Sequence, residues 1–254
     1  MKKNITTRNK VPYLRMGKGE PLVLIHGLGE VKEGWVNQYE LSDQYDLIIP
    51  DLRGHGEYTS PGDITMKDFA ADLISLLQEL NIKRANICGL SMGGMVAQEL
   101  YRQAPDMCHT LILVSTYHYA PKLLGKAFIQ YRKSQTRKSK SFKERAARFC
   151  LYSWDKENIK NFHEFYKPNK HYYFKAMEAC QQVNNVFLLP KINAPTLILG
   201  GQYDAVTPVI NQYIMHKQIP HSEFIIFRKT GHVAKFEAKD KFNKVIREFL
   251  KKHN

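Results

Sequence analysis

Ser91 lies in the run ICGLSMGG (residues 87–94), which contains the pattern Gly-x-Ser-x-Gly. This pattern is typical of a sharp turn between a strand and a helix that lifts the serine hydroxyl out of the sheet. Glycines are needed beside such a serine because the strand and the helix approach so closely that larger side chains would clash. The N–H groups at the start of the helix would face an anion formed above Ser91. The run therefore predicts a serine that acts as a nucleophile.

A serine nucleophile requires a general base and a carboxylate that orients the base, and two later residues fit these roles. His232 lies in the sequence TGH (230–232), and Asp204 lies in GQYD (201–204). Each follows a short apolar stretch that is typical of a strand. In a parallel sheet, such residues must come from loops at the carboxyl ends of the strands. We predict that Ser91 is the nucleophile, His232 the base and Asp204 the acid.

Other acidic and imidazole side chains are weaker candidates for this chemistry. Asp51 also ends an apolar strand and could serve as the acid, but Asp204 has the better context. Most other histidines have no pattern around them, so we interpret them as surface or packing residues. These histidines are His109, His118, His163, His171, His216, His221 and His253.

The elements that must position these residues alternate between strand and helix. Short continuous apolar stretches predict strands, whereas residues 65–80 have apolar side chains at helical spacing, with Thr65 as the expected N-cap. Strands are expected at residues 21–27, 46–51, 84–88, 111–114, 196–199 and 224–227, and helices at 65–80, 92–104 and 239–251. This alternation indicates an α/β fold with a mostly parallel sheet covered by helices on both faces.

One segment interrupts the alternation. Residues 117–190 indicate helices rich in lysine, arginine and aromatic residues, and they lie between two expected strands. We therefore predict one α/β domain formed by residues 1–116 and 191–254, with residues 117–190 inserted as a helical cap over the strand ends. A chain of 254 residues is long enough to bury the core of such a domain.

The charge of the chain is concentrated in this segment. Between His118 and Pro190 there are fifteen Lys and Arg against five Asp and Glu, which gives +10 of the net charge of +14. Three interpretations are open: a solvated outer face, a positive pocket lining that attracts a carboxylate-bearing substrate, or contact with nucleic acid or an anionic membrane. No recognition motif accompanies the third. We favour the outer face, because lysines inside an apolar pocket would lose much of their hydration.

Five motifs, taken in order, resemble those of the α/β-hydrolase superfamily. They are HGLG (26–29), DLRGHG (51–56), GLSMGG (89–94), GQYD (201–204) and GH (231–232). The resemblance covers the chain outside the inserted segment and is to the lid-bearing kind, which includes enol-lactonases, carboxylesterases, non-heme haloperoxidases and carbon–carbon bond hydrolases. It implies a catalytic triad of Ser91, Asp204 and His232, and an oxyanion hole formed by the backbone N–H groups of Leu28 and Met92.

The resemblance implies a serine hydrolase that cleaves a small carboxylic ester or lactone through an acyl-enzyme, with no metal or organic cofactor. In this setting His26 and His55 are expected to brace their loops rather than to take part in catalysis. One alternative keeps the triad for carbon–carbon bond hydrolysis or haloperoxidase-like chemistry, a choice that cap residues would decide. The other alternative is a ligand receptor or regulatory partner with slow turnover on a hydrolase scaffold.

The compartment follows from features that the sequence lacks. No apolar run approaches the length that crosses a membrane, and the basic start MKKNITTRNK (1–10) has no apolar core after it, so neither membrane insertion nor secretion is predicted. Widely spaced cysteines without metal-site spacing predict buried free thiols in the cytoplasm. They are Cys88, Cys108, Cys150 and Cys180. The expected partner is a small-molecule substrate and not a nucleic acid, and the oligomeric state is left open.

Overall fold

The computed structural model describes residues 3–6, 11–59, 62–136 and 142–253. Its centre is an eight-stranded sheet with the strand order β1-β2-β4-β3-β5-β6-β7-β8. The strands are β1 (Lys3–Thr6), β2 (Pro12–Met16), β3 (Glu20–Ile25), β4 (Tyr45–Pro50), β5 (Ala85–Leu90), β6 (Cys108–Val114), β7 (Thr196–Gly201) and β8 (Glu223–Phe227). The strands from β3 to β8 pair in parallel, so the prediction of a mostly parallel sheet is confirmed.

The first two strands were not predicted. β1 pairs antiparallel with β2, and β2 pairs antiparallel with β4, where Leu14 lies opposite Ile49. Both strands are short, and β1 carries polar residues, so the apolar-run criterion does not find it. Residues 1–2 and 7–10 of the basic start, and residues 137–141 of the predicted cap, lie outside the described part of the chain.

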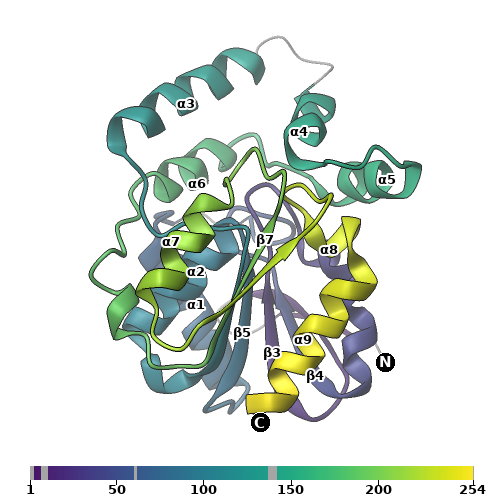
Figure 1. The fold of residues 1–254 in the computed structure, drawn as a ribbon, viewed down its shortest axis with the longest axis vertical. Helices are drawn as coiled ribbons and strands as arrows, with labels where there is room; N and C mark the ends of the chain where they lie inside the picture. The colour runs from purple at the N-terminus through teal and green to yellow at the C-terminus, as the bar shows by residue number, and fades with distance from the viewer. Residues whose placement is uncertain (1–2, 7–10, 60–61, 137–141, 254) are drawn as a thin grey trace.

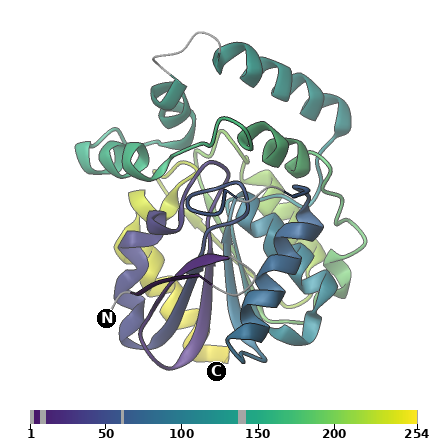
Figure 2. The ribbon, with the colours of Figure 1, turned by 180° about the vertical axis from the view of Figure 1, so that it is seen from behind.

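Helices cover both faces of the sheet, as Figures 1 and 2 show. They are α1 (Met66–Glu79), α2 (Met92–Gln103), α3 (Lys122–Thr136), α4 (Phe142–Cys150), α5 (Lys156–Phe165), α6 (Tyr173–Cys180), α7 (Ile210–Gln218), α8 (Ala234–Glu237) and α9 (Lys239–His253). Alternate residues of β3 show why both faces must be covered. Val23 packs in the core formed with α1, α2 and α7, whereas Leu24 packs in the core on the side of α9.

Local sequence signals explain where α1 begins. The Thr65 side chain accepts a hydrogen bond from the Asp68 N–H, and the Asp68 carboxylate accepts one from the Thr65 N–H. This reciprocal pair satisfies N–H groups that the first helical turn leaves without partners. The predicted N-cap at Thr65 is therefore confirmed.

The helices α3, α4, α5 and α6, which we call the upper helices, follow β6 and precede β7 in the chain. Figures 1 and 2 show them as a separate layer beyond one end of the sheet, on the side of the turn between β5 and α2. Among the lysines and arginines of residues 117–190 whose side chains the structure describes, Arg132 alone is buried. The others are exposed or half-buried, so most of the described positive charge of this segment faces solvent.

Candidate active site

Ser91 occupies the turn between β5 and α2 in a strained backbone conformation. Its φ is 56° and its ψ is −117°, a region that non-glycine residues rarely adopt and that costs about 1–3 kcal/mol. Two hydrogen bonds hold the turn. The Ser91 N–H donates to the Val114 carbonyl at 2.8 Å, and the Thr116 hydroxyl donates to the Ser91 carbonyl at 2.7 Å. The sharp strand–turn–helix predicted for residues 87–94 is present.

Two glycines allow α2 to approach the sheet this closely. A Cβ added at Gly89 would lie 2.2 Å from the Gly93 carbonyl oxygen, and one added at Gly93 would lie 2.3 Å from the Ile25 carbonyl oxygen. Both contacts are with backbone, which cannot move aside as a flexible side chain could. A larger residue at either position would therefore displace α2 and the serine at its start.

His232 and Asp204 lie together, as predicted, in the loops that follow β8 and β7. His232 Nδ1 is 2.8 Å from Asp204 Oδ2, and both side chains are buried. Because the carboxylate can only accept, His232 Nδ1 carries the proton in this contact and Nε2 is left as the basic nitrogen. The backbone N–H of His232 also donates to the Cys150 carbonyl at 2.7 Å, which ties the loop to the end of α4.

The Asp204 carboxylate is fixed by three further hydrogen bonds. Oδ1 accepts the N–H groups of Val206 and Thr207, and Oδ2 accepts the Thr207 hydroxyl, each at 2.8 Å. Burial by itself would raise the pKa of Asp204, but the facing His232 and the hydrogen bonds from His232 and Thr207 outweigh it and hold that pKa below its usual value. Asp204 therefore stays ionised and can stabilise an imidazolium.

Asp51, the alternative acid, has a different environment. It is fully buried, and its carboxylate accepts hydrogen bonds from the Lys32 N–H and the Lys32 ammonium, both at 2.8 Å. A third bond comes from the Glu57 N–H at 3.0 Å. The structure thus brings Asp204 to His232 and engages Asp51 in a buried ion pair.

Hydrogen bonds of Glu30 hold the loop that carries Leu28. Glu30 accepts the Gly27 N–H at 3.1 Å and the Lys235 ammonium at 3.0 Å, so this pair links the Leu28 loop to the segment after His232. Lys235 is fully buried, with its ammonium 4.4 Å from the ring centroid of Trp35. Leu28 and Ser91 line the same cavity. Met92, the other predicted oxyanion donor, is the first residue of α2, where an N–H has no partner within the helix.

His26 and His55 are buried next to each other with ring centroids 5.1 Å apart. His26 Nδ1 donates to the Gly27 carbonyl at 2.8 Å, and its Nε2 accepts the Leu52 N–H at 3.0 Å, so the neutral ring joins two loops. Burial lowers the pKa of His26 to about 4, and burial together with His26 lowers the pKa of His55 to about 3. Both contacts of His26 are with backbone, which fits a bracing role.

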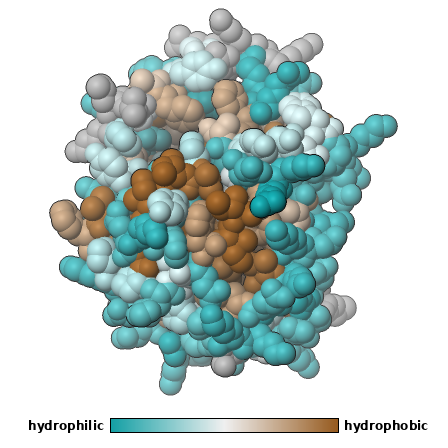
Figure 3. Space-filling view, in the orientation of Figure 1, coloured by the Kyte–Doolittle hydropathy of each residue, from teal (hydrophilic) through white to brown (hydrophobic). Residues whose placement is uncertain are grey.

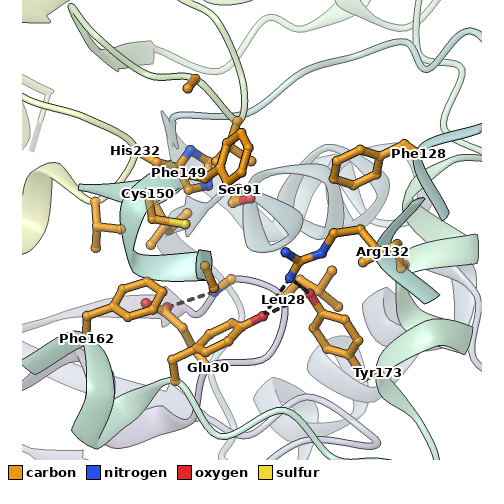
Figure 4. Close-up of a pocket in the computed structure, with 18 of the residues that line it drawn as sticks. Leu28, Glu30, Ser91, Phe128, Arg132, Phe149, Cys150, Phe162, Tyr173 and His232 are labelled. Carbon is orange, nitrogen blue, oxygen red and sulfur yellow. Dashed lines mark hydrogen bonds between the residues drawn. The ribbon is translucent and has the colours of Figure 1, made fainter. Parts of the chain in front are cut away.

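Ser91 and His232 line a cavity of about 350 Å³ beneath the upper helices (Figure 4). Most of its other walls are aromatic or aliphatic, and many of these side chains come from the upper helices. They include Phe128, Phe149, Phe162, Tyr166, Tyr173 and Met177. A second cavity of about 260 Å³ shares Leu28, Ser91 and Phe128 with the first, and among the described side chains no charged one lines it. The serine therefore stands where two mainly apolar spaces meet.

The outer surface beside the site is also apolar in part. Figure 3 shows apolar side chains gathered below the upper helices on the face seen in Figure 1. Exposed apolar residues include Val206 on the loop after β7, Ile210 and Ile214 on α7, and Ile226 on β8. Val206 also lines both cavities, so this apolar surface reaches the site.

Several residues of the site were not predicted. Arg132 reaches the cavity from α3, and Glu30, Lys235 and Thr207 support the loops around it. Arg132 is one of many basic residues in its segment, so composition gives no signal that distinguishes it. Glu30 and Thr207 each lie within four residues of a predicted site residue, and that proximity is a signal that could have found them.

Three further observations concern metal ligands, the cysteines and membrane-spanning helices. Within the described ranges, no three His, Cys, Asp or Glu side chains converge in a way that could hold a metal ion. All four cysteines are free, and burial raises the pKa of each thiol, in the case of Cys108 to about 12. Among the described helices, none is both long and apolar enough to cross a membrane.

Comparisons with known proteins identify the family and the fold. The sequence model of the family described as alpha/beta hydrolase fold matches residues 20–239. The chain is 27% identical over 255 residues to 3-oxoadipate enol-lactonase 2 of Acinetobacter baylyi, covering 95% of this chain and 93% of that protein. It is 26% identical over 246 residues to (E)-2-((N-methylformamido)methylene)succinate hydrolase of the same organism, covering 94% and 93%.

A solved structure is similar over the whole chain. The thermophilic esterase from Thermogutta terrifontis, determined with malate bound, has a TM-score of 0.88 and 28% identity, and the match covers 100% of both chains. Together with the family match, this similarity confirms the predicted α/β-hydrolase fold.

Proposed function

The chain belongs to the alpha/beta hydrolase fold family, and on that premise we propose that it is a serine hydrolase that cleaves a small carboxylic ester or lactone. The observation that carries the proposal is the buried contact of His232 Nδ1 with Asp204 in the cavity that Ser91 lines. Support for an ester or lactone comes from the similar proteins, which are an esterase, an enol-lactonase and a further hydrolase.

The proposed mechanism gives each predicted residue a role. His232 Nε2 takes the proton of the Ser91 hydroxyl as its oxygen attacks the substrate carbonyl, and Asp204 stabilises the resulting imidazolium. The N–H groups of Leu28 and Met92 stabilise the oxyanion of the tetrahedral intermediate. His232 then protonates the leaving alcohol. In the second half of the reaction, His232 takes a proton from the water that attacks the acyl-enzyme, and it returns a proton to the Ser91 oxygen as the acid product leaves.

We further propose that residues 117–190 act as a cap over this site, inserted in a core of residues 1–116 and 191–254. The apolar side chains that the upper helices contribute to the cavity support this division. A cap of this kind would exclude water from the oxyanion and would select the substrate.

The test is to replace Ser91 with alanine. Ser91→Ala should lower kcat/KM for para-nitrophenyl butyrate by about 10⁴-fold or more while circular dichroism and Tm stay close to wild type. A fluorophosphonate should label Ser91 and leave Ser115, a buried serine of the same region, unlabelled. Near wild-type turnover in the alanine variant, or labelling of another serine, would refute the proposal. Preferential hydrolysis of a meta-cleavage dienoate, or formation of a peracid from acetate and hydrogen peroxide in preference to ester hydrolysis, would favour the alternative chemistries.

A further inference from the structure

Arg132 is a buried cation in the wall of the proposed active site. Its side chain is on α3, the residue is 9% exposed, and it lines the cavity together with Ser91 and His232. Figure 4 shows its guanidinium beside Leu28 and the Tyr173 hydroxyl, facing the interior of the cavity. A charge in this position stands within the space that a substrate must occupy.

Two tyrosines, Tyr166 directly after α5 and Tyr173 at the start of α6, hold the guanidinium. Arg132 Nη2 donates to the Tyr173 hydroxyl at 2.9 Å and to the Tyr166 hydroxyl at 3.4 Å. The Tyr166 hydroxyl in turn donates to the Tyr173 hydroxyl at 2.9 Å. All three side chains are buried, so the planar group is held in one orientation. An arginine fork that is fixed in this way loses little freedom when it binds a planar anion.

The surroundings of Arg132 favour an anionic ligand. Most of the cavity wall is apolar or aromatic. In such surroundings a hydrogen bond between charged groups is stronger than in water. Glu30, the carboxylate that lines the same cavity, accepts bonds from Lys235 and the Gly27 N–H. A neutral apolar substrate would gain nothing from a buried cation, whereas a carboxylate would form an ion pair and a charge-assisted hydrogen bond with the guanidinium.

We propose that Arg132 binds a free carboxylate of the substrate, so that the substrate class is an ester or lactone that carries a second, ionised carboxylate. This inference rests on the proposed function, because it concerns the same cavity. Arg132 would thus supply the positive pocket lining that was one of three interpretations of the charge in residues 117–190. The other described lysines and arginines of residues 117–190 are exposed or half-buried, so they lie outside this contact.

The experiment compares esters of equal shape that differ in charge. In one pair the acyl part differs: para-nitrophenyl hydrogen adipate against para-nitrophenyl isooctanoate. In the other pair the alcohol part differs: γ-acetoxybutyrate against isohexyl acetate. The wild-type protein should prefer the anionic member of at least one pair, and Arg132→Met should lower that preference, as a ratio of kcat/KM values, by about thirtyfold or more. Arg132→Lys should retain part of the preference, because lysine keeps the positive charge but lacks the planar guanidinium.

Lys126→Met provides the matched control. It removes the same charge from the same helix, but Lys126 is exposed, so the preference should stay within about twofold of wild type at 0.15 M salt. If Arg132 only held the upper helices together, Arg132→Met would lower kcat/KM for both members of each pair equally. Such a result, or the absence of any anionic preference in the wild type, would overturn the inference and leave the serine hydrolase proposal standing.

Binding of adipate to the Ser91→Ala protein separates this inference from the proposed function, because it requires no turnover. Isothermal titration calorimetry should show adipate binding that Arg132→Met weakens by about thirtyfold and that Lys126→Met leaves unchanged. If no ester is hydrolysed and adipate still binds in this Arg132-dependent way, the proposed function fails and the carboxylate site stands. Adipate binding that is absent, or that is equal in the Arg132→Met protein, would overturn the site.

Discussion

The loops at the end of the sheet and the upper helices form opposite walls of one cavity, but they are built differently. On the sheet side, the important side chains are fixed by hydrogen bonds to backbone, as for Asp204, which accepts two N–H groups, and His26, which joins two loops. On the helical side, aromatic packing and one Arg132–tyrosine cluster form the wall. Under the proposed function, the sheet side supplies the reacting groups and the helical side selects the substrate.

A few hydrogen bonds join the two regions near the proposed base. The Cys150 carbonyl accepts the His232 N–H, and Glu237 accepts the N–H groups of Tyr152, Ser153 and Gly231 at distances from 2.6 to 2.8 Å. On the other side of the site, the Lys167 N–H donates to the Gly29 carbonyl at 2.7 Å. A displacement of the upper helices would therefore reach both the His232 loop and the Leu28 loop.

The largest expected effect on activity concerns Asp204, and the other buried aspartate of the sheet side, Asp51, serves as its comparison. Asp204→Asn should lower kcat/KM by about 10³–10⁴-fold with little change in Tm, because the amide would favour the wrong tautomer of His232. Asp51→Asn should instead lower the free energy of unfolding by about 3–5 kcal/mol, because it breaks a buried ion pair with Lys32. Ester kinetics and chemical denaturation of both variants test this. The reverse order of activity losses would identify Asp51 as the acid.

The second prediction concerns acid stability of the sheet side. His26 and His55 are neutral in the fold, with pKa values of about 4 and about 3, whereas an unfolded histidine titrates near 6.5. The unfolded chain therefore binds more protons below pH 6.5, and stability falls as the pH decreases from about 6.5 to about 4. Between pH 7.5 and pH 5, each histidine should remove about 2 kcal/mol from the free energy of unfolding.

Urea denaturation at several pH values measures this loss. His55→Phe removes one of the two groups, and a phenyl ring can pack against Phe69 as the imidazole does. The slope of stability against pH should then decrease by about 1.4 kcal/mol per pH unit between pH 6 and pH 4.5, relative to wild type. The remaining ionisable groups are the same in both proteins, so their contribution cancels in the difference. An unchanged slope would mean that His55 is charged in the fold.

The smallest expected effect concerns the link between the two regions. Glu237→Gln replaces one of the two accepting oxygens with an amide nitrogen, which cannot accept the N–H group that faces it. We expect kcat to fall by about tenfold, because the His232 loop and the end of α4 lose their common partner. Glu248→Gln on α9, an exposed residue, is the control and should change kcat by less than about twofold. Equal values of kcat in the two variants would show that this link does not position the base.

Local patterns in the sequence predict most of the sheet side of the molecule. The motifs around Ser91, Asp204 and His232 are short, because each one describes a single turn at the end of a strand. The strand β3 and the helices α1 and α9 were found within a few residues, since their apolar patterns follow from the faces they bury. By contrast, the antiparallel strand β1 is mostly polar, and β2 is a strand of only five residues in which Arg15 interrupts the apolar run, so neither was recognised.

The other wall of the cavity depends on contacts between residues far apart in the chain. Arg132 is buried and Lys126 is exposed although they lie on the same helix, because the contacts of α3 with Tyr166 and Tyr173 bury one side of it. Those tyrosines are 34 and 41 residues away from Arg132 in the chain. The roles of Asp51 and Asp204 likewise depend on their partners in space, because Asp51 pairs with Lys32 and Asp204 pairs with His232. Local sequence carries the geometry of a turn, whereas the position of one side chain among distant helices depends on how those helices pack.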